Sequence, residues 1–350
     1  MRSFDYTTLV KKTWDSEIIN LVAQIHEYKG RQEVYLKQKP EELEKLVEVA
    51  KRQSTEASNA IEGIRTTSTR LKQLCEEKTT PKNRAEEEIL GYRDVLNTIH
   101  ENYEYIPIRS NYILQLHRDL YKYTEKSIGG QFKISQNVIA ATDETGKEYV
   151  LFTLLAPYET PAAIDSICDN YNRMIENEDL DVLLLIPIFI HDFLCIHPFS
   201  DGNGRMSRLL TALLLYRSGY VVGKYVSIES KIAKNKDSYY LALEECQMGW
   251  YENKEDVAPF VKYMLRIILA AYRDFEERVE LVSERLPAKE IVRRAVYSKM
   301  GKLRKSDIAE LCPSVSVKSV ELALKQLVKE GVLIKNGSGR ATFYVRSDSK

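Results

Sequence analysis

Cysteine, proline and glycine are all scarce in this 350-residue sequence, with 5, 10 and 15 copies respectively. The five cysteines are scattered and form no Cys-x-x-Cys pair, which excludes a disulfide framework and the common zinc-site spacings, and favours a reducing compartment. Because few residues break helices and the charged stretches have helical spacing, we expect a mainly α-helical chain.

Long hydrophobic runs are absent as well. The longest, Val182–Ile190, has about half the length that spans a bilayer. Residues 1–15 contain no apolar segment of the kind found in signal peptides. We therefore expect a cytoplasmic protein with no membrane partner. A hydrophobic content of 44% with 29% charged residues is ordinary for a globular protein, and this length suits two or three domains.

No charge of one sign dominates the whole chain, but its two parts differ. Residues 286–350 hold fourteen Lys and Arg against six Asp and Glu, a net charge of +8, whereas residues 1–285 hold 37 against 45, a net charge of −8. A basic block on an acidic body indicates a separate module that meets a polyanion. An unevenly charged solvated surface is the alternative.

The apolar periodicity predicts a helical body. Helices are expected within residues 17–50 and over residues 84–101, 110–123, 161–177, 181–195, 204–217, 235–248 and 255–284. Between them, two β-prone runs, 138–141 and 148–152, flank a turn-rich hexapeptide and predict one β-hairpin.

One helix end carries an unusual acid. Pro40 is expected to open a helix that Gly63 ends, which leaves Glu62 in the last turn. The negative end of the helix dipole disfavours a carboxylate there. We therefore expect Glu62 to pair with a cation from elsewhere in the fold.

The C-terminal segment, residues 287–346, has its own pattern. Helices over 288–298, 305–311 and 316–330, followed by two short β-prone runs around a glycine-rich turn, predict a winged helix-turn-helix. Residues 316–330 would be the recognition helix, with Lys318, Lys325 and Arg340 available to phosphates. Domains of this pattern also mediate protein contacts, so DNA binding rests on analogy of fold.

The sequence HPFSDGNGRMSR, residues 197–208, carries the chemistry. Glycines at 202 and 204 expose backbone amides at the start of the helix that follows, which makes an anion site, and Asn203 can add a side-chain donor. Arg205 and Arg208 lie three residues apart and suit a di- or triphosphate.

Two further side chains complete this loop. Asp201 supplies the hard oxygen that Mg²⁺ accepts, with phosphates providing other ligands. His197 can take a proton from an attacking hydroxyl at neutral pH. These parts predict transfer of a nucleotide or phosphoryl group to an alcohol.

Residues 197–208 resemble the signature of the Fic family, HPFx[DE]GNGRxxR, at every fixed position. The resemblance extends over roughly residues 5–280. The hairpin at 136–152 resembles the family's target-docking flap, residues 235–243 resemble the segment that closes the adenine pocket, and residues 58–63 resemble the inhibitory motif [ST]xxxE[GN]. Two departures are Lys236, where Arg is common, and Ser207, where Gly is common.

The resemblance implies a protein adenylyltransferase that moves AMP from ATP to a Ser, Thr or Tyr hydroxyl, with ATP as substrate and Mg²⁺ as cofactor. It implies His197 as the general base and Asp201 as the metal ligand. The implied nucleotide-binding residues are Gly202, Asn203, Gly204, Arg205, Arg208, Asn235, Tyr239 and Tyr240. The two tyrosines could equally be core aromatics.

The resemblance further implies that Glu62, with Ser58 in the same motif, holds Arg208 and inhibits the enzyme. Removal of AMP, with Glu62 positioning a water, uses the same fold and stays an alternative, as does transfer of UMP or phosphocholine. We expect an N-terminal helical region at 1–105, a Fic-type core at 106–285 and a winged helix domain at 286–350. A dimer is compatible with the sequence, which does not specify an oligomeric state.

Overall fold

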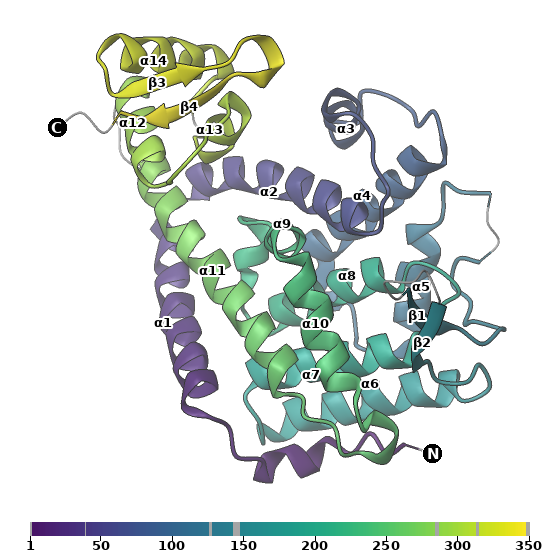
Figure 1. Ribbon diagram of the computed structural model, residues 1–350. Coiled ribbons are helices and arrows are strands. Elements are labelled where there is room, and N and C mark those ends of the chain that lie inside the picture. The colour runs from purple at the N-terminus through teal and green to yellow at the C-terminus, as the bar shows by residue number, and fades with distance from the viewer. Residues whose placement is uncertain are drawn as a thin grey trace.

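The computed structural model describes residues 2–38, 40–125, 128–142, 148–283, 287–312 and 315–347 (Figure 1). Helices dominate the body of the molecule. In chain order its elements are η1 Tyr6–Lys11, α1 Ser16–Gln38, α2 Pro40–Ile61, α3 Ser68–Cys75, α4 Arg84–Asn102, η2 Tyr103–Tyr105, α5 Ser110–Leu120, β1 Val138–Thr142, β2 Glu148–Thr153, α6 Thr160–Asn177, α7 Val182–Ile196, α8 Asn203–Arg217, η3 Val221–Lys224, α9 Ile228–Lys234, α10 Lys236–Gln247, η4 Trp250–Glu252 and α11 Ala258–Ser283.

Helix α7 lies at the centre of the body. Every residue from Leu183 to Ile196 is buried, as expected for a helix that is apolar on all sides. The Asp181 side chain accepts a hydrogen bond from the Leu183 N–H at 2.8 Å and so caps the helix start. Helices α6, α8 and α11 pack against α7, and α1 runs along α11 (Figure 1).

The N-terminal segment is anchored to α7 by a buried charge. Arg2 Nη2 lies 3.0 Å from Oδ1 of Asp192, whose carboxylate also accepts hydrogen bonds from Tyr6 Oη at 2.9 Å and Trp250 Nε1 at 2.7 Å. One apolar cluster runs from Phe4 to Val279. The expected N-terminal region and the expected core are thus packed together around shared apolar residues.

The C-terminal domain has a separate apolar core. It consists of α12 Ala288–Tyr297, α13 Lys305–Leu311, α14 Val317–Lys329, β3 Leu333–Asn336, η5 Gly339–Ala341 and β4 Phe343–Arg346. Strands β3 and β4 pair antiparallel, and Leu303 bridges to Tyr344. The domain follows α11 and lies above α2 (Figure 1), where Gln53 donates to Glu310 at 2.8 Å.

Most of the elements expected from the sequence are present, including the hairpin β1–β2, whose tip falls outside the described residues. Helix α5 ends at Leu120 rather than residue 123, because the Tyr121 N–H turns back to the Arg118 carbonyl. The short elements η1, α3 and α9 were not expected, since six to eight residues carry little periodic signal. No helix in the described ranges has the length and apolar character needed to cross a membrane.

Candidate active site

His197 ends helix α7 in a left-handed conformation, with φ 52° and ψ 63°. This region is uncommon for a residue other than glycine, and it points to a position fixed by its surroundings. The His197 N–H donates to the Phe193 carbonyl at 2.9 Å, and Nδ1 lies 3.3 Å from the Leu194 carbonyl oxygen. Burial lowers the pKa of His197 to about 4, so the ring is neutral near pH 7.

The loop after His197 is held by its own side chains. Phe199 is fully buried and its ring stacks on the His117 ring, with centroids 3.7 Å apart, so it anchors the loop in the core. Asn203 Oδ1 accepts a hydrogen bond from the Phe199 N–H at 2.9 Å, and Asn203 Nδ2 donates to the Phe199 carbonyl at 2.8 Å. The side chain of Asn203 therefore closes the loop, rather than pointing its amide at a ligand.

Two glycines open the start of helix α8. Gly202 caps the helix with φ 85°, and a Cβ there would lie 2.9 Å from the Tyr121 hydroxyl oxygen. At Gly204, a Cβ would collide with Oε1 of Glu62. Only glycine leaves room for an oxygen atom so close to the backbone.

Arg208 joins α8 to α2. Its Nη2 donates to Glu62 Oε1 at 2.8 Å and to the Ser58 carbonyl at 2.9 Å, and its Nε donates to Ser58 Oγ at 2.7 Å. Gly63, with φ 79°, ends α2, and the Ile64 N–H reaches back to the Asn59 carbonyl. The cation expected for the helix-end acid Glu62 is thus Arg208.

Arg205 is buried and faces a different set of groups. Its Nη2 lies 2.8 Å from Glu88 Oε2, and it also donates to the Tyr121 hydroxyl at 2.8 Å. Its Nε and Nη1 atoms have no hydrogen-bond partner among the described residues. The Asp201 side chain is 41% exposed and lies within 3.9 Å of both Arg205 and Arg84.

A cavity of about 260 Å³ opens beside these groups. Its lining includes Glu62, His197, Gly204, Arg208, Tyr239 and Tyr240. Tyr239 is buried and Tyr240 is 44% exposed, with their rings 5.4 Å apart. The cavity therefore brings the expected base, one expected arginine and both expected adenine-end tyrosines together.

Asn235 lies apart from this cavity. It is exposed, ends α9, and its Nδ2 donates to the Lys231 carbonyl at 3.0 Å. Its neighbour Lys236 reaches the site region instead, where Nζ donates to the Ile61 carbonyl at 2.8 Å. A lysine thus satisfies the last turn of α2 where a cation is favourable.

Two residues of this site were not expected from the sequence. Lys133 is buried, its Nζ donates to the Ile196 carbonyl at 2.8 Å, and its N–H donates to the Pro198 carbonyl at 2.8 Å, so it brackets His197. His117 accepts the Gly130 N–H on Nδ1 at 3.0 Å and places Nε2 3.0 Å from the Asp201 carbonyl oxygen. Both residues pair with segments far apart in the chain, so no local sequence pattern predicts these contacts.

The side chains near His197 determine whether this site could bind Mg²⁺. No group of three or more His, Cys, Asp or Glu side chains that could hold a metal ion occurs in the part of the chain that the structure describes. A single exposed carboxylate, that of Asp201, is a donor set that suits Mg²⁺ only when phosphate oxygens supply further ligands. The residues present fit an ion that arrives with a nucleotide.

Comparison with known proteins finds similarity to one family. The Fic/DOC family model matches residues 107–215. A protein adenylyltransferase Fic of Drosophila yakuba is 28% identical over 181 residues, which are 51% of this chain and 31% of that protein. A Fido domain-containing protein of Dictyostelium discoideum is 25% identical over 147 residues, which are 41% of this chain and 98% of that protein. The chain spans about a third of the length of the Drosophila relatives that it matches.

Solved structures agree with this match. A Fic family protein from Desulfovibrio desulfuricans has a TM-score of 0.61 at 21% identity, covering 97% of this chain and 98% of that chain. A Fic domain-containing signaling protein from Bacteroides thetaiotaomicron also has a TM-score of 0.61, at 26% identity, covering 76% of this chain and 97% of that chain. The fold and the loop at 197–208 are thus similar to those of Fic proteins.

Residues 107–215 match the Fic/DOC family, and the fold over most of the chain is that of solved Fic family proteins.

Proposed function

We propose that this chain is a protein adenylyltransferase that moves AMP from ATP to a Ser, Thr or Tyr hydroxyl of a protein. The observation that carries the proposal is the cavity shared by His197, Gly204 and Arg208. It combines a neutral base, bare backbone at a helix start and a guanidinium, which are the parts that an attack on a nucleotide phosphate needs.

His197 acts as the base in this reaction. With Nδ1 turned toward the Leu194 carbonyl, Nε2 is the nitrogen that accepts a proton. As the target hydroxyl oxygen bonds to the α-phosphorus, its proton passes to Nε2 and the bond to the departing diphosphate breaks. The lowered pKa of His197 keeps the base unprotonated at neutral pH.

The phosphates lie at the start of α8 in this proposal. The backbone of Gly202, Asn203 and Gly204 approaches them, and Arg208 binds their distal end. Nη1 of buried Arg205, which has no hydrogen-bond partner in the part of the chain that the structure describes, adds a donor. Asp201 would hold Mg²⁺, which neutralises phosphate charge when bound. Tyr239 and Tyr240 border the base end of the nucleotide, whereas Asn235 has its side chain bonded within α9.

Autoinhibition by Glu62 completes the proposal. Its carboxylate pairs with Arg208 and covers Gly204, so the anion position at the start of α8 holds a carboxylate of the chain itself. A bound triphosphate and Glu62 would compete for the same guanidinium. The wild-type protein is therefore a weak enzyme at rest, and Ser58 strengthens the rest state through its two hydrogen bonds to Arg208.

The experiment is a comparison of AMP incorporation from labelled ATP by wild type and Glu62→Gly. We expect at least a tenfold rise in self-modification for the variant, by the order of magnitude of a lost charged hydrogen bond. Label at the α-phosphate, but not at the γ-phosphate, should enter protein. Incorporation that does not rise in Glu62→Gly contradicts the inhibitory role.

Two controls isolate the site. Glu76→Gly removes a helix-end acid from α3, where it pairs with Lys72 and Lys78, and should leave incorporation at the wild-type level. Glu62→Gly combined with His197→Ala should abolish incorporation, because the base is gone. Activity that persists in this double variant contradicts the role of His197.

Removal of AMP is the second candidate. The carboxylate of Glu62 is one-third exposed and lines the same cavity as His197, so it could orient a water toward a phosphoester. Protein labelled by Glu62→Gly would be purified from the enzyme and incubated with wild type. Release of AMP by wild type but not by Glu62→Gly would favour removal, whereas stable label would favour transfer alone.

A further inference from the structure

The C-terminal domain carries cations that its own acids do not neutralise. Among the described residues, Glu330 pairs with Lys289 and Arg293, Glu321 pairs with Lys305, and Glu310 faces Gln53 of the body. No ion pair joins Lys325 or Lys335 to any acid in the described ranges. The charges of Lys325 and Lys335 are therefore available to a ligand.

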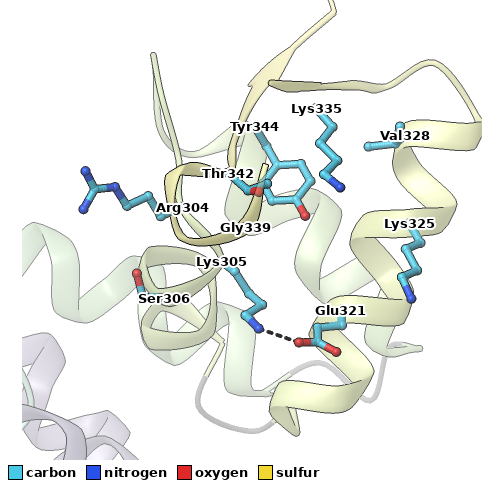
Figure 2. Close-up of a pocket in the computed structure, with 10 residues that line it drawn as sticks. All are labelled: Arg304, Lys305, Ser306, Glu321, Lys325, Val328, Lys335, Gly339, Thr342 and Tyr344. Atoms are coloured by element: carbon cyan, nitrogen blue, oxygen red, sulfur yellow. Dashed lines mark hydrogen bonds and ion pairs between the residues drawn. The ribbon is translucent and has the colours of Figure 1, made fainter. Parts of the chain in front are cut away.

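Three of the lysines surround one hollow of about 760 Å³ (Figure 2). Lys305 comes from the start of α13, Lys325 from α14 and Lys335 from β3, and the Tyr344 hydroxyl points into the space between them. Arg304 extends outward from the rim of the hollow (Figure 2). Among the described residues that line the hollow, Glu321 is the single acid, and it is already paired with Lys305.

Hydroxyl groups and bare backbone complete this lining. Ser306, Thr342 and Tyr344 contribute hydroxyls, and Gly339 has no side chain to block an approach. Lysines with hydroxyl donors are the groups that proteins place against nucleic-acid phosphates. The hollow is too large for a single phosphate and suits a length of phosphate backbone.

The outer face of α14 lies beside the hollow and faces solvent. Val320, Ala323, Leu324 and Leu327 point into the domain core, whereas Lys318, Leu322, Lys325 and Lys329 are exposed. The wide major groove of B-form DNA admits an α-helix, while the deep and narrow major groove of duplex RNA does not. An exposed basic helix next to a phosphate site thus favours DNA.

We propose that this hollow binds the phosphate backbone of duplex DNA, with the outer face of α14 in the adjacent groove. The proposal does not depend on adenylyl transfer, because no residue of the cavity at His197 takes part. Lys325 and Lys335 each contact a phosphate, and Lys305 joins them when the DNA phosphates compete with Glu321.

The test uses the full-length chain and a fluorescein-labelled 30-base-pair DNA duplex of mixed sequence. Binding is followed by fluorescence anisotropy between 25 and 250 mM salt. The test variant is Lys325→Ala with Lys335→Ala. The control variant is Lys289→Ala with Arg293→Ala, which removes the same charge from the α12 side, where both cations pair with Glu330. Circular dichroism checks that both variants are folded.

We expect wild type and the control variant to bind with similar salt dependence. In the test variant, the slope of log affinity against log salt should fall by about 2, with a loss of affinity of tenfold or more, because two phosphate contacts are lost. No binding by wild type at 25 mM salt overturns the proposal. Equal losses in both variants overturn the location, and tighter binding to an RNA duplex of the same length overturns the choice of DNA.

Discussion

Oε1 of Glu62 lies in the space that a Cβ atom on Gly204 would need. The two positions are compatible because residue 204 is glycine, and Arg208 holds the carboxylate there at 2.8 Å. Helix α2 and the loop at 197–208 are therefore in direct contact at Glu62 and Gly204. This contact can be tested without any substrate.

Gly204→Ala should destabilise the wild-type protein by about 1–2 kcal/mol, because the new Cβ must push Glu62 aside. In the Glu62→Gly background the same change should be neutral or slightly stabilising, since alanine favours a helix over glycine. Urea unfolding of the four proteins measures this coupling. Gly30→Ala, in α1 with no neighbour within 4 Å, should have the same effect in both backgrounds. Equal effects of Gly204→Ala in both backgrounds would contradict the contact.

The dependence of the transfer rate on pH, on the acid side of neutral, should report the pKa of His197. Its pKa, lowered to about 4 by burial, predicts that the transfer rate of Glu62→Gly stays level from pH 8 down to about pH 5. Loss of Glu62 removes a nearby negative charge that acts to raise the pKa of His197. Single-turnover rates in buffers of constant ionic strength would measure the profile. A midpoint near 6.5, the value of a solvated imidazole, would contradict a buried base.

Three buried histidines and the half-buried His197 predict acid sensitivity of the fold. Burial lowers the pKa of His100 to about 3 and those of His117, His191 and His197 to about 4. Between pH 6.5 and pH 4 the unfolded chain binds protons at these positions and the folded chain does not. The free energy of unfolding therefore falls as the pH falls, by up to about 1.4 kcal/mol per pH unit for each histidine.

Urea unfolding at pH 7, 6 and 5 measures this dependence. In a His100→Gln variant that is folded at pH 7, the free energy of unfolding should depend less steeply on pH. The decrease should be roughly the contribution of one histidine. A free energy of unfolding that is constant from pH 7 to pH 5 would show that these rings bind protons equally well in the folded state.

Arg2 forms a buried ion pair and Lys12 forms an exposed one, so the two can be compared directly. Arg2→Ala should cost about 3–5 kcal/mol, because Asp192, 1% exposed, is left buried without its cation. Lys12→Ala breaks a pair with Asp256, 66% exposed, and should cost less than about 1 kcal/mol. Thermal unfolding of both variants compares them. Adding Asp192→Asn to Arg2→Ala should recover part of the loss, and similar effects of the two single variants would argue against a buried charge pair.

Local pattern was enough to predict much of this molecule. Most of the helices, the hairpin and the loop at 197–208 follow from periodicity and from glycine and proline positions, whereas the short helices α3 and α9 do not. Glu62 could be singled out because a helix-end acid needs a cation. The partner of Asp201 and Phe199, His117, could not be found in this way, since its role arises only when α5 packs against the loop. Asn203 had the expected position, yet its side chain bonds within the loop.

The segment that matches the Fic/DOC family contains three buried charges whose partners lie outside it. Asp192 meets Arg2, Arg205 meets Glu88, and Arg208 meets Ser58 and Glu62, all from before residue 107. If residues 107–215 were moved into another protein, these charges would be stranded in an apolar interior. A host protein for this segment would therefore have to supply matching partners for Asp192, Arg205 and Arg208.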